Sequence, residues 1–262
     1  MATIQFSHAN GFPAESYSYL FSLLAPHTVQ YVAAFGTGDY PVTHNWYPLV
    51  DELLADIEAR GNLPVVGVGH SLGAILTLWA AQRKPAYFER LILFDPPFFS
   101  LPLRSIFFAL NKLGLSGRTI PIARQALRRR AHFDDKASAF SYWKPKRLFQ
   151  RFHEQCFSDY VEHSLVPAPE GGLRLRISPA LEHRIFSHTP YRIGPVRLPM
   201  PIHYLYPKHG SVLPPADLRS LHRRFPGSEL VAVEGGHMFP LEHPEATAAR
   251  IHQIIATGRS ER

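Results

Sequence analysis

The alternation of short apolar segments with helical segments constrains the fold of this chain more than any other feature. The first apolar runs lie at residues 3–8, 28–35, 64–69 and 90–95. Between them, at residues 15–25, 46–61 and 72–85, apolar side chains recur at helical spacing. The run at 64–69 is nearly all apolar, which is typical of a strand covered on both faces. This order of elements predicts a parallel sheet with right-handed crossovers.

The alternation stops after Pro96 and resumes near residue 200. The expected later elements are strands at 200–206 and 229–235 and helices at 215–225 and 243–258. In between, we expect helices within 103–115, 121–133 and 142–164, a short extended piece at 171–177 and a helix at 178–186 that is N-capped by Ser178. The sequence therefore predicts a core made of residues 1–96 and 196–262, with residues 97–195 inserted as a helical cap.

The composition fits one large domain in a reducing compartment. The chain has 262 residues, of which 45% are hydrophobic, and this is enough for one core with an insertion. Cys156 is the single cysteine, so no internal disulfide is expected. The first residues do not resemble a signal peptide, and no apolar run approaches the roughly 18 residues of a membrane span. We therefore expect a cytoplasmic location, while the oligomeric state stays open.

The turn after the third apolar run carries the main chemical signal. Gly69-His70-Ser71-Leu72-Gly73 stands between an expected strand and an expected helix, which is the context that the G-x-S-x-G signature requires. Such a tight turn leaves no room for side chains at the two glycines and exposes the serine hydroxyl. The backbone N–H of Leu72, at the helix N-terminus, can stabilise an oxyanion. Ser71 is therefore the candidate nucleophile.

A serine needs a base, and His237 is the best placed of the 15 histidines. It follows the last expected strand, so its loop reaches the same carboxyl edge of the sheet as the serine turn. His243 begins the last helix and is expected at the surface. His8, His70 and His209 are simply interpreted as hydrogen-bonded loop histidines, although His70 is also a candidate substrate contact.

The loop after the first strand, "SHANGF", is expected to supply a second oxyanion donor. The N–H of Asn10 is the candidate, and the N–H of Phe12 is the alternative. Apolar residues near these loops and in the cap are candidate substrate contacts, although cap aromatic residues also form plain cores. This set consists of Phe12, Phe98, Phe99, Phe107 and Met238.

The sequence resembles the α/β-hydrolase superfamily with a helical cap. "SHANGF" resembles the oxyanion loop of that family, "GHSLG" its nucleophile turn and "GGHMFPLEHPE" its catalytic-histidine loop. The resemblance covers about Ile4–Pro96 and Pro199–Ile255, and it implies serine–histidine–acid chemistry. One departure is that the usual N-terminal antiparallel strand pair is missing, which leaves about six strands.

The acid is the second departure. The family usually places it after the strand that follows the cap, but Ser211 stands there and Asp217 comes too late. Asp95, at the end of the strand before the cap, can reach the same histidine and orient its ring, although an Asp before two prolines can also simply cap a turn. Glu234 and Glu242 are the alternatives.

The basic excess lies in the cap. From Phe98 to Pro190 there are 15 Lys or Arg against 7 Asp or Glu, whereas the rest of the chain has 13 against 14. The simplest interpretation is a solvated Arg-rich face. The alternative is a surface that attracts an anionic substrate or an anionic membrane surface. Four arginines stand close together at Arg124, Arg128, Arg129 and Arg130, and they suit an anionic head group such as the phosphates of an acyl thioester.

These observations predict a hydrolase of a carboxylic ester or thioester with an apolar acyl group. Two alternatives stay open: the same serine used for carbon–carbon cleavage, perhydrolysis or a lyase reaction, and a non-catalytic binding protein on the same scaffold. No nucleic-acid motif and no metal-ligand spacing is present. We therefore expect a small-molecule substrate, no cofactor, no metal and no nucleic acid.

Overall fold

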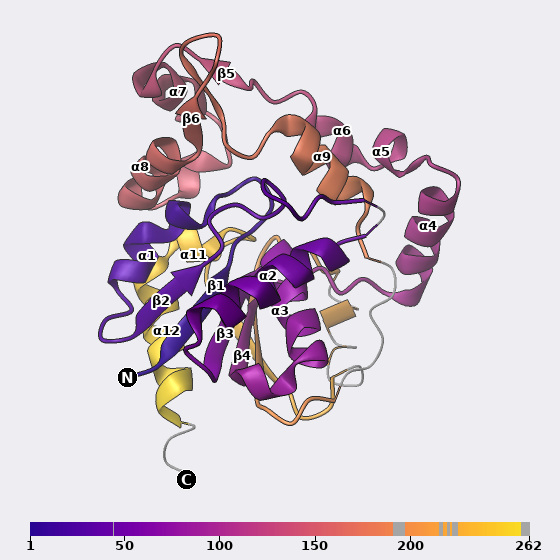
Figure 1. Ribbon diagram of the computed structural model, residues 1–262, viewed down its shortest axis with the longest axis vertical. Coiled ribbons are helices and arrows are strands. Elements are labelled where there is room, and N and C mark those ends of the chain that lie inside the picture. Colours follow the sequence, from indigo (N-terminus) through magenta and orange to yellow (C-terminus); the bar gives the residue numbers. More distant parts are fainter. Residues whose placement is uncertain (44, 191–196, 215–216, 219–220, 222–224, 258–262) are drawn as a thin grey trace.

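The centre of the molecule is a six-stranded parallel sheet in the order β2-β1-β3-β4-β8-β9 (Figure 1). The computed structural model describes residues 1–43, 45–190, 197–214, 217–218, 221 and 225–257. The strands are β1 (Thr3–Ser7), β2 (Thr28–Tyr31), β3 (Val65–His70), β4 (Phe88–Phe94), β8 (Ile202–Pro207) and β9 (Glu229–Val233). The expected parallel sheet of about six strands is confirmed.

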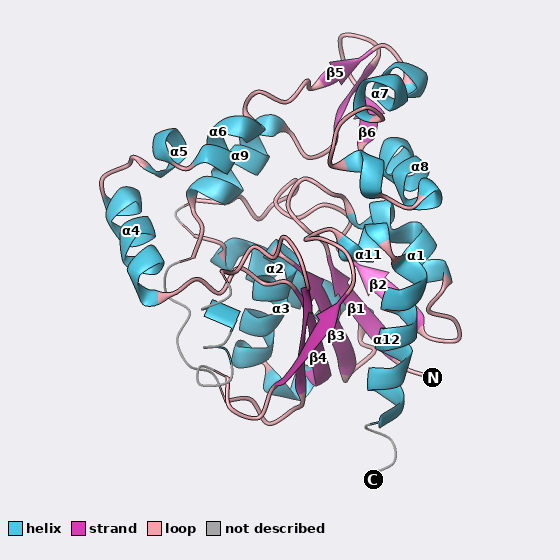
Figure 2. Cartoon of the chain, turned by 180° about the vertical axis from the view of Figure 1, so that it is seen from behind, coloured by secondary structure: helices cyan, strands magenta, loops and turns pink. Residues whose placement is uncertain are grey.

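Helices cover both faces of this sheet, α2 and α3 on one face and α1 and α12 on the other (Figure 2). Their bounds are α1 (Ser18–Ser22), α2 (Tyr47–Arg60), α3 (Leu72–Arg83) and α12 (Pro244–Thr257). Because both faces are buried, alternate residues of β4 enter different cores: Leu91 and Leu93 enter one, and Ile92 and Phe94 enter the other. This double burial explains why the strands are nearly continuous apolar runs.

The connecting elements are short, and one expected helix lies mostly outside the described residues. Two 3-10 turns, η1 (Ala14–Tyr17) and η2 (Pro85–Tyr87), precede α1 and β4, and α11 (Phe239–Glu242) precedes α12. The helix expected at 215–225 includes seven residues that the structure does not describe. In the part of the chain that is described, no helix is both long and apolar enough to cross a bilayer.

The segment between β4 and β8 lies over the carboxyl ends of the sheet strands, at the top of Figure 1. Its helices are α4 (Leu101–Lys112), α5 (Ser116–Thr119), α6 (Pro121–Ala126), α7 (Lys136–Trp143), α8 (Glu154–His163) and α9 (Pro179–Ser187), with a 3-10 turn η3 (Phe149–Arg151). It also holds a small antiparallel sheet in the order β5 (His132–Phe133), β7 (Leu173–Leu175) and β6 (Leu165–Pro167).

The small sheet partly corrects the expectation of a helical cap: β7 lies within the extended piece expected at 171–177, whereas β5 and β6 lie where helices were expected or no strand was expected. The helix expected over 121–133 ends at Ala126, because His132 and Phe133 pair with β7, which lies about forty positions further along the chain. The start of α9 agrees with expectation, since Ser178 Oγ accepts the N–H of Leu181 at 3.2 Å. The division into core and cap stays a prediction, and its second boundary falls within 191–196, outside the described residues.

Candidate active site

Ser71 occupies the turn that joins β3 to α3. Its backbone has φ 53° and ψ −110°, a conformation that a residue with a side chain rarely adopts. The N–H of Ser71 donates to the carbonyl of Phe94 at 2.9 Å, so the turn is tied to the end of β4. A backbone held in such a conformation costs about 1–3 kcal/mol and is concentrated at functional sites. Ser71 is therefore a structural candidate as well as a motif candidate.

The two glycines that flank this turn are required by packing. A Cβ on Gly69 would lie 2.5 Å from the carbonyl oxygen of Gly73, and a Cβ on Gly73 would lie 2.0 Å from the carbonyl oxygen of Ser7. Both contacts are with backbone, which cannot move aside. The spacing of the motif therefore reflects how closely α3 packs against β1 and β3 at this point.

Asp95 and His237 meet at the same edge of the sheet. Asp95 follows β4 directly, has a positive φ of 40° and is fully buried. Its Oδ2 lies 2.7 Å from Nδ1 of His237, which belongs to the loop between β9 and α11. The structure thus brings together two of the predicted site residues that lie 142 positions apart in the sequence.

Two further donors hold the carboxylate of Asp95. The hydroxyl of Ser211 donates to Oδ1 at 2.5 Å, and the backbone N–H of Val212 donates to Oδ2 at 3.0 Å. Ser211 Oγ also accepts the N–H of Leu213 at 3.1 Å, which leaves its hydroxyl proton for Asp95. In the sequence, Ser211 stands out only as the residue in place of the expected acid. The structure shows it bound to the carboxylate, a role that its position in that turn could have indicated.

The hydrogen bond to Asp95 determines which nitrogen of His237 carries the proton. A carboxylate accepts hydrogen bonds, so Nδ1 donates and Nε2 keeps its lone pair. The side chain of His237 is 26% exposed, while that of Asp95 has no exposure. The ring is therefore anchored on its buried side and presents an acceptor nitrogen on the other.

His70 fastens the serine turn to the loop of His237. Its Nε2–H donates to the carbonyl of His237 at 2.9 Å, and its Nδ1 accepts the hydroxyl of Tyr17 at 2.7 Å. Burial, with a smaller contribution from His237, lowers the pKa of His70 well below its usual value, so the ring is neutral. The expectation that His70 contacts substrate is corrected, because the ring is fully buried and both of its nitrogens bind the protein.

The candidate oxyanion donors differ in their hydrogen bonding. The N–H of Phe12 donates to the carbonyl of Ala9 at 3.2 Å and is therefore occupied. Among the described residues, no acceptor takes the N–H of Asn10. The N–H of Leu72 lies in the first turn of α3, where a helix leaves its N–H groups without an intrahelical partner. Asn10 and Leu72 thus remain the candidates.

A family model and several solved structures match the chain. The model described as "Alpha/beta hydrolase family" matches residues 6–250, nearly the whole chain. This chain belongs to the alpha/beta hydrolase family. No curated protein matches this hydrolase closely enough to be counted as a relative.

Solved structures similar to this hydrolase have low sequence identity and the same fold. E-2-(acetamidomethylene)succinate hydrolase is 20% identical with a TM-score of 0.76, and the match covers 97% of this chain and 91% of that chain. The peroxisomal alpha-beta-hydrolase Lpx1 from Saccharomyces cerevisiae is 16% identical with a TM-score of 0.72, over 97% and 75%. The thioesterase domain from the curacin biosynthetic pathway is 18% identical with a TM-score of 0.70, over 95% and 90%.

The alternative acids of this hydrolase have other partners. Glu242 accepts the N–H of Gly236 at 2.7 Å and pairs with Arg151 of the cap at 3.1 Å. It therefore stabilises the loop that carries His237. Glu234 is exposed and pairs with Lys208. Asp217 is buried and accepts the N–H of Ser100 at 3.0 Å. Asp95 is therefore the carboxylate with the contact that the triad hypothesis needs.

His8 and Cys156 are both buried in the fold. His8 is fully buried between the carbonyl of Ala9 and the N–H of Phe35, both at 2.9 Å, and burial lowers its pKa to about 4. This agrees with the interpretation of His8 as a loop histidine. Burial raises the pKa of the Cys156 thiol to about 12, so this thiol is a poor nucleophile. Within the described residues, no three potential metal-ligating side chains lie together.

The apolar candidates divide into core residues and partly exposed ones. Phe98 is fully buried, with its ring centroid 5.5 Å from that of Tyr204 and 4.6 Å from that of Phe225. Phe98 belongs to the core that α2 and α3 share with the sheet, which corrects its assignment to substrate. Met238 is 4% exposed and packs in the core that α1 and α12 share with the sheet.

Three aromatic candidates keep some exposure. Phe99 and Phe107 are half-buried and form an edge-to-face pair with centroids 5.2 Å apart. Phe12 is half-buried against the ring of Tyr160 of α8, at 5.0 Å. Because Phe12 follows the loop of Asn10, its ring lies where that loop meets the cap.

Proposed function

We propose that this chain is a serine hydrolase that cleaves a carboxylic ester or thioester, with Ser71 as nucleophile, His237 as general base and Asp95 as the acid of the triad. The observation that carries the proposal is the 2.7 Å contact between Asp95 and His237 beside the strained turn of Ser71. An imidazole oriented by a buried carboxylate, with its second nitrogen free to accept, is the arrangement that activates a serine hydroxyl.

The first half of the reaction transfers the acyl group to the protein. Ser71 Oγ attacks the carbonyl carbon while Nε2 of His237 takes the hydroxyl proton. The negative oxygen that forms accepts the N–H groups of Leu72 and Asn10. As the tetrahedral intermediate collapses, the carbon–oxygen or carbon–sulfur bond breaks and His237 returns the proton to the leaving group.

The second half repeats these steps with water. His237 removes a proton from water, whose oxygen attacks the acyl carbon. The intermediate releases Ser71 when its oxygen regains the proton, and the carboxylic acid leaves. Throughout, Asp95 stabilises the imidazolium and keeps the ring in one orientation. The products are one acid and one alcohol or thiol, and no cofactor is consumed.

Partly exposed aromatic side chains support an apolar acyl group, and the single cysteine supports a cytoplasmic setting. Phe12 and the Phe99–Phe107 pair leave aromatic surface partly exposed, as expected of a pocket that receives a hydrocarbon chain. A single buried cysteine is typical of proteins in a reducing compartment. Esterase and thioesterase are also among the names of proteins with this fold.

A fluorophosphonate probe tests the nucleophile, and a series of p-nitrophenyl esters tests the acyl group. Intact-mass measurement is expected to show one adduct on the wild type and none on Ser71→Ala. Ser141→Ala, which changes an exposed serine of the cap, is the matched control and is expected to label fully. Turnover is expected to rise with acyl length, because a longer chain buries more apolar area.

The alternatives give different outcomes in the same experiment. Labelling of Ser71 without turnover of any ester or thioester would favour another reaction of the same nucleophile, such as carbon–carbon cleavage, perhydrolysis or a lyase reaction. A wild-type protein that the probe does not label would favour a non-catalytic binding role. A flat response to acyl length would contradict the apolar acyl group alone.

A further inference from the structure

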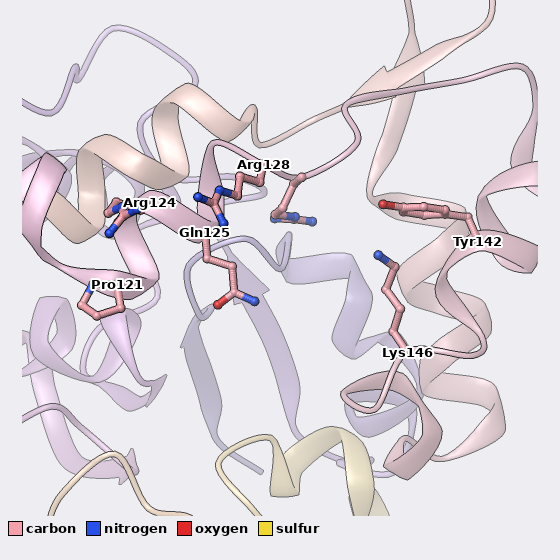
Figure 3. Close-up of a pocket in the computed structure, with 7 residues that line it drawn as sticks. Pro121, Arg124, Gln125, Arg128, Tyr142 and Lys146 are labelled. Carbon is pink, nitrogen blue, oxygen red and sulfur yellow. The ribbon is translucent and has the colours of Figure 1, made fainter.

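A basic pocket opens between α6 and the turn after α7 (Figure 3). Its volume is about 550 Å³. We call it the basic pocket and define it by its polar and charged lining, which consists of Arg124, Gln125, Arg128, Arg129, Tyr142 and Lys146. In Figure 3, Gln125 and Arg128 lie on one side of an open space, and Tyr142 and Lys146 lie on the other. The pocket thus collects four cationic groups from two separate elements.

Among the described residues, most of this positive charge has no counter-charge. In the parts of the chain that are described, Arg129 alone of the four cations forms an ion pair, with Glu182. Lys146 Nζ lies 3.8 Å from the centroid of the Tyr142 ring, a cation–π contact that leaves its charge uncompensated. Like charges that converge on one space repel, so an anion that enters the pocket gains interactions with several of them at once.

The kind of cation and its spacing favour phosphate groups. Arg124 and Arg128 are four residues apart, and the N–H of Arg128 bonds to the carbonyl of Gln125 at 3.0 Å, which continues the helical turn. Guanidinium groups bind phosphate through paired hydrogen bonds, and Lys146 adds a point charge from the opposite wall. Residues 96–133 contain seven Lys or Arg and no Asp or Glu, so no carboxylate of that segment competes.

Arg129 connects the basic pocket to the candidate active site. Its side chain bonds to the hydroxyl of Tyr160 at 2.8 Å, and a Cβ on Gly11 would lie 3.0 Å from its Nη1. The carbonyl of Glu182, the partner of Arg129, accepts the side-chain amide of Asn10 at 3.1 Å. The inner end of the pocket therefore lies directly on the loop that holds the proposed oxyanion donor Asn10.

We infer that the basic pocket binds the phosphate-bearing end of the substrate, an ester or thioester whose leaving group carries one or more phosphate groups. Such a molecule would extend from the pocket past Arg129 to Ser71. That the acyl end of this substrate reaches Ser71 rests on the proposed function. Phosphate binding in the basic pocket does not depend on catalysis.

A lipid surface is the other source of phosphate that the experiment has to separate. The same cap segment exposes several large apolar side chains, which are those of Ile106, Phe108, Leu113, Leu115, Ile122 and Leu127. Exposed apolar and cationic side chains together also suit an anionic bilayer. Soluble phosphates and vesicles are therefore separate arms of the test.

The first arm measures binding without turnover. Inorganic pyrophosphate and coenzyme A are titrated by calorimetry into Ser71→Ala, with and without the added double substitution Arg124→Glu/Arg128→Glu. We expect the double substitution to weaken both affinities by at least about tenfold. Arg118→Glu/Arg184→Glu makes the same charge change at exposed cap residues that do not line the pocket, and it is expected to shift the affinities by less than about twofold. Added salt is expected to weaken binding, because it screens these charges.

The second arm measures selectivity. The ratio of kcat/KM for a decanoyl thioester of coenzyme A to that for the phosphate-free decanoyl thioester of N-acetylcysteamine is expected to fall at least about tenfold in Arg124→Glu/Arg128→Glu. The control pair is expected to keep the wild-type ratio. The third arm sediments the protein with phosphatidylcholine vesicles that contain or lack phosphatidylglycerol.

Each outcome decides one part of the proposal. Equal pyrophosphate affinity in both double variants, or no measurable binding, would overturn the phosphate site. Sedimentation with phosphatidylglycerol vesicles in the absence of pyrophosphate binding would assign the cap to a lipid surface and overturn the substrate assignment. Pocket-dependent binding of pyrophosphate by a protein that hydrolyses no ester or thioester would support the phosphate site and refute the proposed function.

Discussion

Replacing Asp95 with alanine removes the carboxylate that bonds to Nδ1 of His237. Three groups then lose their acceptor: Nδ1–H of His237, the hydroxyl of Ser211 and the N–H of Val212. The ring can rotate or present its other tautomer, in which Nε2 carries the proton and cannot take the hydroxyl proton of Ser71 as the proposed mechanism requires. We therefore expect catalysis to fall while the fold, which depends on the apolar cores, persists.

The size of the loss follows from the charge that forms during the reaction. In the proposed mechanism His237 becomes an imidazolium in the transition state, 2.7 Å from a carboxylate that is fully buried. At a charge separation of about 4 Å and an effective dielectric constant of about 20, this attraction is about 4 kcal/mol. Each 1.4 kcal/mol corresponds to about tenfold in rate, so kcat/KM is expected to fall about a thousandfold.

Asp95→Asn is expected to lose the contribution of the charge, about a thousandfold in kcat/KM, and Asp95→Ala at least as much, because alanine also frees the ring. The N–H of Val212 and Nδ1–H of His237 both donate to Oδ2, so the amide oxygen of an asparagine is favoured at that place. Its NH₂ group then faces Ser211, whose hydroxyl can rotate to accept. This orientation keeps the tautomer of His237 and removes only the negative charge.

The assay is steady-state hydrolysis of the best p-nitrophenyl ester, with thermal melting as a check on folding. Glu234→Gln is the control, because this exposed carboxylate pairs with Lys208 and not with His237. It is expected to keep wild-type kinetics. If Asp95→Ala retained kcat/KM within tenfold of the wild type, the assignment of the acid would be wrong.

Three further predictions concern the supports of the site. Ser211→Ala removes a donor to the buried carboxylate of Asp95. A hydrogen bond to a charged group contributes about 1.5–3 kcal/mol, so kcat/KM is expected to fall about 10- to 150-fold, and unchanged ester kinetics would contradict a positioning role. Gly73→Ala places a Cβ 2.0 Å from the carbonyl of Ser7, and urea denaturation is expected to show a loss of about 1–3 kcal/mol or more. Burial lowers the pKa of His8 from 6.5 to about 4, so below pH 6.5 the unfolded chain gains a proton that the folded chain does not. This difference is expected to lower the free energy of unfolding by about 3 kcal/mol between pH 6.5 and 4, and His8→Gln is expected to reduce that slope.

The core of the fold could be predicted because its signals are local. Leu49, Leu53 and Ile57 form the buried stripe of α2, and Gly61 ends that helix with a positive φ of 68°. These features are visible in a single run of residues. The cap was predicted less well, because His132 and Phe133 follow a helical pattern but pair with a distant strand. Tertiary pairing overrides local propensity in such short segments.

The candidate site shows the same division. The glycines around Ser71 are part of a recognisable turn, and the loops of Asn10 and His237 can be placed at one sheet edge from the order of strands. The role of His70 in holding the serine turn to the loop of His237 was missed, because no local sequence pattern indicates Tyr17 as its partner. The donation from Ser211 to Asp95 was missed as well, although the position of Ser211 in the turn after β8 could have indicated it.

By itself, then, the sequence determined the parallel sheet, the serine turn and the loops at its carboxyl edge, since each follows from the pattern of a few consecutive residues. Only the tertiary structure decided that Asp95 holds His237, that Phe98 is a core residue and that Arg129 lies over Gly11. Those contacts join residues far apart in the chain. Their geometry depends on how the helices and the cap pack around the sheet, and no local pattern encodes that packing.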